Sequence, residues 1–130
     1  MKFIDLFNTY LLSVSGVVDK FGNNIRYNAV PANISADNWW MIWRTIRRTA
    51  NYEYGGIRKP SSYSIELEID ILYKYSKDIE DYAEDLIDNL FDTESNNFRV
   101  MQVEAQIPSF YEERGINVIT IPLTIKYSKK

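Results

Sequence analysis

Cysteine and histidine are both absent from the 130 residues of this chain. Without cysteine there is no disulfide framework, no thiol nucleophile, no redox pair and no cysteine zinc site. Without histidine, the usual general base near neutral pH and the commonest metal ligand are missing. The sequence also has neither a G-x-x-x-x-G-K-[ST] nor a G-x-G-x-x-G motif. We therefore expect a binding or structural protein, not an enzyme, with no metal and no cofactor.

Long hydrophobic runs are absent as well. No stretch approaches the roughly 18 apolar residues of a membrane-spanning helix, so we expect no membrane partner. The length and the 45% hydrophobic content are typical of one globular unit that buries its own core. We expect a single domain over residues 1–130, with long connections at about 15–38 and 51–60.

Charge is divided unevenly along the chain. Residues 1–60 carry eight basic and four acidic side chains, and residues 61–130 carry seven basic and fourteen acidic ones. Such a polarised chain could attach head to tail to copies of itself, with its positive region against a negative one. The simpler alternative is that one helix has an acidic face in solvent.

Hydrophobic periodicity predicts an α+β fold. Apolar residues recur with helical spacing over 2–14 and 77–91, which predicts two amphipathic helices. A helix placed between strands of an otherwise antiparallel sheet indicates that both helices pack on one face of that sheet. We expect strands, from alternation or β-favouring composition, at 24–27, 62–73, 98–107 and 116–127, with a hairpin loop at 108–115.

The tryptophan-rich segment 38–50 is ambiguous. With a period of 3.6, its apolar residues share one helix face, and this periodicity slightly favours a helix. With a period of two, Trp39, Met41 and Trp43 point one way, while Trp40, Ile42, Arg44, Ile46 and Arg48 point the other. The pattern alone does not decide between the two.

If this segment is a strand, the face that carries Trp40, Arg44 and Arg48 is too apolar to lie in water and too charged to lie in a core. We interpret that face as a subunit interface, because Trp, Tyr and Arg supply most interface hot spots. The alternatives are stacking on single-stranded nucleic acid, or tryptophans in the core with an arginine rim. A pI near 5.0 argues against general nucleic-acid affinity. The candidate subunit or tube interface comprises Trp40, Ile42, Arg44, Arg48, Tyr52, Tyr54, Arg58 and Lys59.

Glu66, Glu68 and Asp70 form a row of carboxylates along one face of the strand at 62–73. Three carboxylates in line do not converge on a metal, and glycoside hydrolysis needs two carboxyl groups that face each other across a cleft. The row is either a solvated strand face or a surface that repels a passing polyanion.

Four different features follow one another along the chain. They are the amphipathic helix from Phe3 to Val14 followed by the segment IRYNAVP at 25–31; a Trp/Ile strand that ends in Arg-Thr; a long strand over 63–75 that runs into an acidic helix containing Tyr82-Ala83-Glu84; and a closing hairpin that ends at Tyr127. In this order of elements, the chain resembles the tail terminator (tail completion) proteins of long-tailed bacteriophages.

The resemblance implies that residues 39–50 form a strand in a twisted, mainly antiparallel sheet with helices on one side. It also implies a homo-oligomeric ring of six copies that caps the head-proximal end of the tail tube and ends tube growth. The implied partners are the tail tube protein, the head–tail connector proteins and double-stranded DNA, which passes through without sticking. The implied location is the virion tail, after assembly in the host cytoplasm.

A carboxylate-lined hole would keep the affinity for DNA low by like-charge repulsion. We therefore take Glu66, Glu68 and Asp70 as the candidate DNA-repelling lumen. Two other functions stay open, a head–tail connector or stopper ring subunit, and a nucleic-acid-binding accessory domain that uses the Trp/Arg segment.

Overall fold

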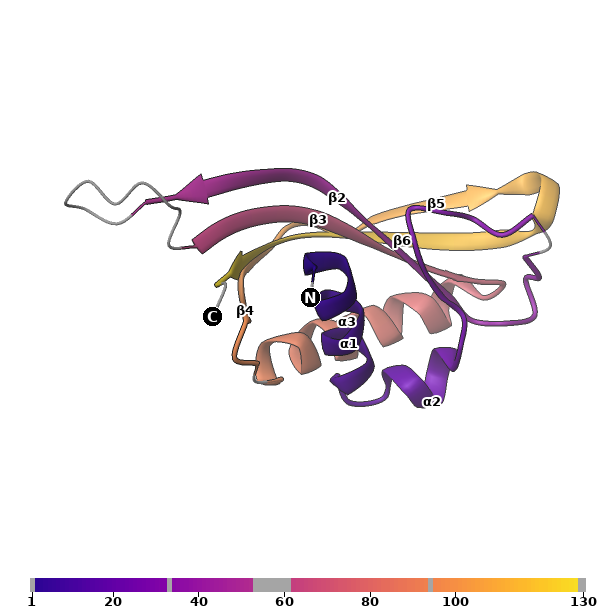
Figure 1. Ribbon diagram of the computed structural model, residues 1–130. Coiled ribbons are helices and arrows are strands. Elements are labelled where there is room, and N and C mark those ends of the chain that lie inside the picture. The colour runs from indigo at the N-terminus through magenta and orange to yellow at the C-terminus, as the bar shows by residue number, and fades with distance from the viewer. Residues whose placement is uncertain (1, 33, 53–61, 94, 129–130) are drawn as a thin grey trace.

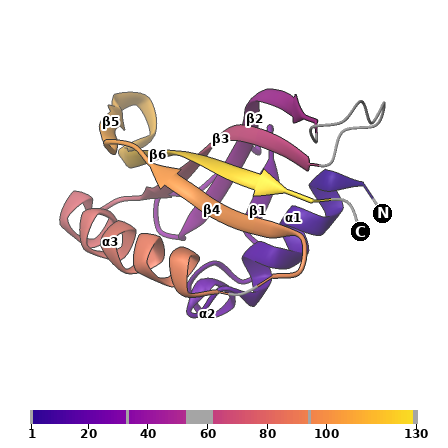
Figure 2. The same ribbon diagram turned by 90° about the vertical axis from the view of Figure 1, so that its left-hand side faces the viewer.

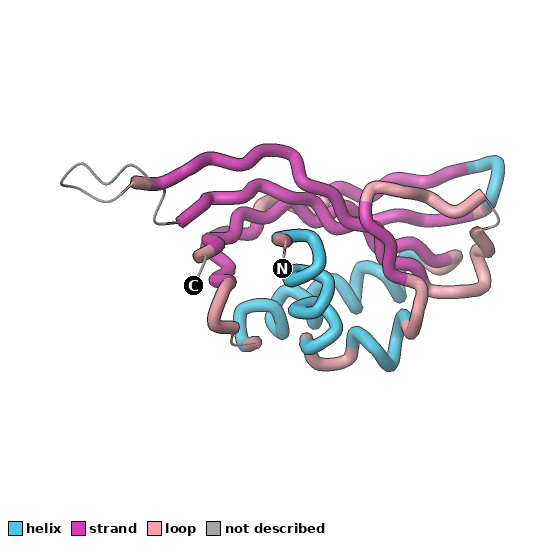
Figure 3. Tube along the Cα trace, in the orientation of Figure 1, coloured by secondary structure: helices cyan, strands magenta, loops and turns pink. Residues whose placement is uncertain are grey.

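The computed structural model describes residues 2–32, 34–52, 62–93 and 95–128 (Figures 1 and 3). It has an α+β fold with a mainly antiparallel sheet and helices on one face, as the sequence predicts. The elements are α1 (Phe3–Ser13), α2 (Val17–Phe21), β1 (Ile25–Tyr27), β2 (Trp40–Asn51), β3 (Ser62–Tyr73), α3 (Ser76–Asp92), β4 (Phe98–Val103), β5 (Ile107–Tyr111), the short 3-10 helix η1 (Glu112–Arg114) and β6 (Ile116–Tyr127).

The six strands form one sheet in the order β1-β2-β3-β6-β4, and β5 also pairs with β6. Among the strands of the described residues, only β1 and β2 run parallel to each other. β4 and β5 follow each other along the same edge of β6, with β5 pairing residues 116–120 and β4 pairing residues 123–127. Pro122 lies at the break between them, where its carbonyl accepts a 2.9 Å hydrogen bond from the Glu104 amide. Because proline has no amide hydrogen to donate, it suits a place where the ladder is interrupted.

The main core lies between the sheet and its three helices, which all cover the same face (Figures 1 and 2). Alternate residues of β3 and β6, from Ile65 to Ile71 and from Ile119 to Ile125, point toward the helices and are buried. Aromatic rings fill the space between β2 and α1, where the ring centres of Phe7 and Trp43 lie 4.7 Å apart. The indole of Trp43 also donates a 2.8 Å hydrogen bond to Asn8 Oδ1, which ties α1 to the sheet.

Segment 40–51 is a strand, as the resemblance implies, and the helical periodicity is misleading there. β2 pairs with β3 from Trp40 to Asn51, so hydrogen bonds to a distant segment decide its conformation. The segment is rich in Trp, Ile and Thr, which fit a pleated surface well.

A β-bulge corrects the expected face of Arg48. Thr45 pairs with Leu67 and Arg47 pairs with Glu66, so Ile46 is an extra residue without its own partner on β3. The extra residue reverses the alternation beyond this point. Arg48 therefore lies on the helix side, with its guanidinium 5.2 Å from the centre of the Phe3 ring. The prediction that Arg48 shares a face with Trp40 and Arg44 is wrong, and Arg47 takes that place.

The expected loops contain regular structure. The connection 15–38 includes α2 and β1, and the strand expected over 98–107 ends at Val103. The expected hairpin loop 108–115 holds most of β5 and all of η1. Most of the expected connection 51–60 lies outside the described residues. None of the helices in the described ranges combines the length and apolar character needed to cross a membrane.

Candidate interface on the open face of the sheet

The sheet face opposite the helices carries the predicted carboxylate row and part of the candidate interface. Near the middle of β2 and β3 it presents charged side chains that we call the polar ladder, namely Arg44, Arg47, Glu66, Glu68 and Asp70. Toward the start of β2 it carries a small second core that we call the outer apolar cluster, namely Ile34, Trp40, Ile42, Leu72, Ile116 and Val118.

Arg44 is the centre of the polar ladder. Its guanidinium donates to Asp70 Oδ2 at 2.7 Å and to Glu68 Oε1 at 2.6 Å. The second oxygen of Asp70 accepts a 2.6 Å hydrogen bond from the Thr120 hydroxyl of β6. The side chains of Arg44, Glu68 and Asp70 are only 31%, 26% and 14% exposed. Hydrogen bonding to Asp70, offset in part by burial, raises the pKa of Arg44, so the group stays charged.

Arg47 and Glu66 form a second, more exposed pair. The Arg47 Nε and Nη2 atoms donate to the two oxygens of Glu66 at 2.6 and 3.0 Å, which is a bidentate arrangement. The bulge at Ile46 makes this pair possible, because it turns Arg47 to the face that Glu66 occupies.

The ladder matches three carboxylates with two guanidinium groups. The sequence predicts separate sites for the carboxylate row and for Arg44, and the structure brings them together on adjacent strands. The row therefore presents less uncompensated negative charge than its sequence suggests, while its place in a lumen stays a prediction. In the described ranges, no group of three or more acidic residues is placed to hold a metal ion.

Two predicted interface residues, Trp40 and Ile42, are covered by the chain itself. They are 9% and 4% exposed beneath Ile34 and Ala36 of the connection before β2. The indole nitrogen of Trp40 is buried and has no hydrogen-bond partner among the described residues. These two side chains stabilise the fold of the connection and are not available to another subunit in this arrangement.

One predicted interface residue, Tyr52, lies at the far end of β2. Tyr52 follows the strand and is 61% exposed. Tyr54, Arg58 and Lys59 lie outside the described residues. Of the candidate interface, Arg48 and Tyr52 are thus the described residues that are exposed and open to a partner.

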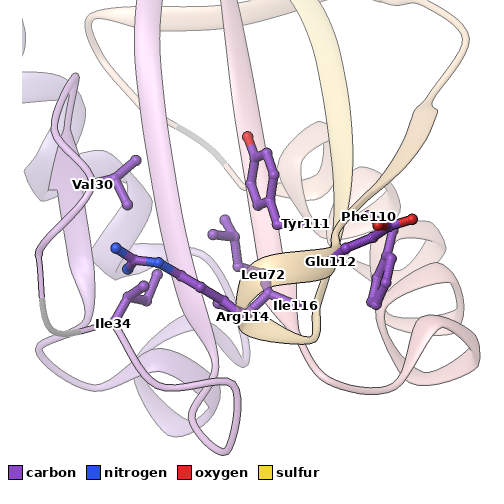
Figure 4. Close-up of a pocket in the computed structure, with 8 residues that line it drawn as sticks. All are labelled: Val30, Ile34, Leu72, Phe110, Tyr111, Glu112, Arg114 and Ile116. Carbon is purple, nitrogen blue, oxygen red and sulfur yellow. The ribbon is translucent and has the colours of Figure 1, made fainter.

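A groove that the sequence did not reveal adjoins the outer apolar cluster (Figure 4). Its volume is about 490 Å³, and its lining comprises Val30, Ile34, Leu72, Phe110, Tyr111, Glu112, Arg114 and Ile116. Phe110 and Tyr111 are each 52% exposed, although they belong to a regular strand. The signal for this site was the apolar and aromatic run Ile107-Pro-Ser-Phe-Tyr111, which is unusual for a solvent loop.

The outer surface of α3 is strongly acidic. The helix carries seven carboxylates against the single cation Lys77, which bonds Asp81 at 2.6 Å. At the edge of this surface the ammonium of Lys20 lies 4.5 Å from the centre of the Trp39 ring and 5.2 Å from that of Tyr82, which links α2 to α3. The rest of the acidic face is open to solvent or to a basic partner.

No protein-family model matches this sequence, and neither does any curated protein. The fold is similar to that of a chain in a solved structure described as the virion of a native gene transfer agent (GTA) particle. The TM-score is 0.59 at 8% sequence identity, and the match covers 94% of this chain and 91% of that chain. The chain therefore shares, over nearly its whole length, the fold of a protein found in a virion.

Proposed function

We propose that this protein is a structural component of a bacteriophage-like virion, and that it forms a ring that caps the head-proximal end of the tail tube. In that position it ends tube growth, joins the tail to the head connector and lets DNA pass. The observation that carries the proposal is the whole-chain match to a fold found in a virion, because a gene transfer agent is a bacteriophage-like particle. The order of elements, which resembles that of tail terminator proteins, supports the finer assignment.

The surfaces of the molecule suit an assembly. A closed ring requires two different patches on each subunit, and this chain offers an exposed strand end at Tyr52 and an apolar groove beside β5. The sheet between them is held by long antiparallel ladders from β2 to β3 and from β3 to β6, so it can act as a stiff spacer.

The tryptophans on which the nucleic-acid-binding alternative depends are not exposed as a stacking surface. Trp40 and Trp43 are buried, and Trp39 is already stacked on Tyr73 at a ring distance of 4.4 Å. Stacking of bases needs accessible aromatic faces, so these three side chains do not form such a platform. The connector or stopper ring subunit remains the second candidate, since it has the same structural requirements.

Localisation in the particle tests the proposal. The gene is inactivated in the virus that carries it, and a tagged copy is supplied in trans. We expect that the inactivated virus yields tails of irregular length and unjoined heads, and that electron microscopy of the complemented particles places the tag on the tail side of the head–tail joint. A tag on the connector side, with tails of normal length, would support the stopper ring instead. Complete virions without the protein would refute both.

Charge reversal of Arg44 is not a clean test of ring assembly. Because Arg44 bonds Glu68 and Asp70 of its own chain, Arg44→Glu would disturb the fold as well as any subunit contact. Tyr52 and Tyr111 are better positions, since both side chains are mostly exposed.

A further inference from the structure

We infer that a pocket between α2 and α3 binds the ammonium group of an aliphatic amine, either a free amine or the side chain of a lysine on another protein. The pocket has a volume of about 320 Å³ and lies on the helix side of the sheet (Figure 1). Its lining comes from α2, from α3, from the last residue before β2 and from the last residue of β3. This binding site goes beyond the proposed function, and neither depends on the other.

Three aromatic rings form one wall of the pocket. The Trp39 ring stacks on that of Tyr73 with centres 4.4 Å apart, and the Tyr82 ring meets Trp39 edge to face at 5.6 Å. The buried ring of Phe21 contacts both Trp39 and Tyr82, at 6.2 and 5.5 Å. The Asn24 side-chain amide donates a 3.3 Å hydrogen bond to the Trp39 carbonyl. Because these contacts hold the rings in place before a ligand arrives, the wall is preorganised.

The side chain of Lys20 shows that an alkylammonium group fits this wall. Its nitrogen lies 4.5 Å from the centre of the Trp39 ring and 5.2 Å from that of Tyr82, so one ammonium group contacts two rings. The face of an aromatic ring attracts such a cation electrostatically. None of the ion pairs in the described part of the chain involves Lys20. The volume of the pocket lies beside Lys20, so there is room for a second alkyl chain.

Carboxylates outnumber cations in the lining of the pocket. Asp78, Asp81 and Asp85 line it, against the single ammonium of Lys20. Lys77 bonds Asp81 at 2.6 Å, whereas Asp78 and Asp85 are exposed and form no ion pair within the described ranges. A cation that enters the pocket therefore meets aromatic faces and unpaired negative charge together. This combination favours an organic cation, because a strongly hydrated metal ion keeps its water and gains little from an aromatic face.

Two cations of equal charge test the site. Purified protein is titrated with the diamine putrescine and, separately, with Mg²⁺ at constant ionic strength, and tryptophan fluorescence is recorded. Trp40 and Trp43 are buried, so the change in fluorescence reports mainly on Trp39. We expect putrescine to reach half-saturation at a concentration about tenfold lower than Mg²⁺. Equal responses to the two cations would indicate an ordinary acidic surface and would overturn the inference.

Three variants separate the pocket from the general charge of α3. Asp85→Asn removes a carboxylate of the lining and should weaken putrescine binding by about fivefold. Glu80→Gln is the matched control, because Glu80 is exposed on the same helix outside the lining, and it should weaken binding by less than about twofold. Lys20→Met removes the competing ammonium and should strengthen binding by about threefold. Equal losses for the first two variants, or weaker binding by the third, would contradict the assignment.

A second probe identifies the source of the ammonium group. All three replaced side chains are exposed, so each variant should keep the urea unfolding midpoint of the parent chain. A peptide with blocked ends and one central lysine is titrated against the same variants. Peptide binding that follows the same order of variants supports a lysine side chain as the ligand, and binding of putrescine alone supports a free amine. Binding of neither probe overturns the inference, while the proposed function still stands on the likeness to a virion protein.

Discussion

At the scale of single residues, Arg44 is central to the open face of the sheet because it forms two ion pairs there. It joins Glu68 and Asp70 of β3, and Asp70 in turn accepts from Thr120 of β6, so one guanidinium links three strands. Carboxylates this far from water are costly when they have no partner. Arg47, in contrast, forms its pair with Glu66 largely in solvent.

Replacing Arg44 should therefore destabilise the protein far more than replacing Arg47. We expect Arg44→Met to lower the free energy of unfolding by about 2 kcal/mol, since it leaves two partly buried carboxylates without their cation. Arg47→Met is the matched control and should leave the free energy of unfolding nearly unchanged, as is usual for exposed pairs. Urea unfolding monitored by tryptophan fluorescence measures both, and equal losses would contradict this view of the ladder.

Tyr82 makes the stability of the fold depend on pH in the alkaline range. Burial, and secondarily the charge of Asp85, raises its pKa from 10.0 to about 12. Between these values the folded state keeps a proton that the unfolded state has lost, so the contribution of Tyr82 to stability falls as pH rises from about 10 to about 12. Below pH 10 this contribution is constant.

Tyr82→Phe should remove that pH dependence. Its hydroxyl has no hydrogen-bond partner in the described part of the chain, so we expect stability at pH 7 to change by less than about 1 kcal/mol. Tyr10→Phe is the comparison, because the Tyr10 hydroxyl donates to the Leu90 carbonyl at 2.9 Å, and its removal should cost about 1 kcal/mol. Because burial raises the pKa of Tyr10 as well, urea unfolding at pH 7 distinguishes the two variants, and unfolding at pH 11 tests the pH dependence. An unchanged pH profile for Tyr82→Phe would be the contrary result.

At the scale of elements, the bulge in β2 determines which arginine faces which side. Ile46 is the extra residue, and it is mostly exposed, so little packing depends on it. Without it, Thr45 would be followed directly by the residue that pairs with Glu66. The bulge also increases the local twist of β2.

Deleting Ile46 should leave a folded protein with a regular β2. All later pairs with β3 keep their partners after this deletion, so we expect a cooperative unfolding transition with a midpoint near that of the parent chain. Deleting Ile42 is the control, because it shifts Trp40 and Met41 to opposite faces and should abolish cooperative folding. Circular dichroism and urea titration test both variants; a folded Ile42 deletion would show that the register is loosely specified.

At the scale of the whole molecule, the uneven distribution of charge predicts that assembly depends on salt. The outer face of α3 is strongly acidic, and screening by salt weakens attraction between exposed charges but leaves apolar contact in place. We expect incorporation of the purified protein into particles that lack it to fall by roughly tenfold between 0.02 and 0.5 M NaCl. The incorporated protein is measured by immunoblotting of purified particles, and an unchanged amount would indicate that charge plays no part in assembly.

Some of this architecture was readable in the sequence because it depends on local pattern. The alternation of Ile65, Leu67, Ile69 and Ile71 can satisfy only a strand buried on one face, and β3 follows it. The helical spacing in α1 and α3 predicted their buried faces, although Phe91 proved exposed at the end of α3. Absence of cysteine and histidine likewise needed no structure to interpret.

Only the tertiary structure decided the rest, because the deciding contacts join residues far apart in the chain. The pairing of Arg44 with Glu68 and Asp70 depends on the register of β2 against β3, and the side taken by Arg48 depends on one unpaired residue at Ile46. The groove exists because the connection at Val30 and Ile34 comes to lie opposite Phe110 and Tyr111. Periodicity reports which side of an element is apolar, whereas register and long-range packing determine which side chains meet.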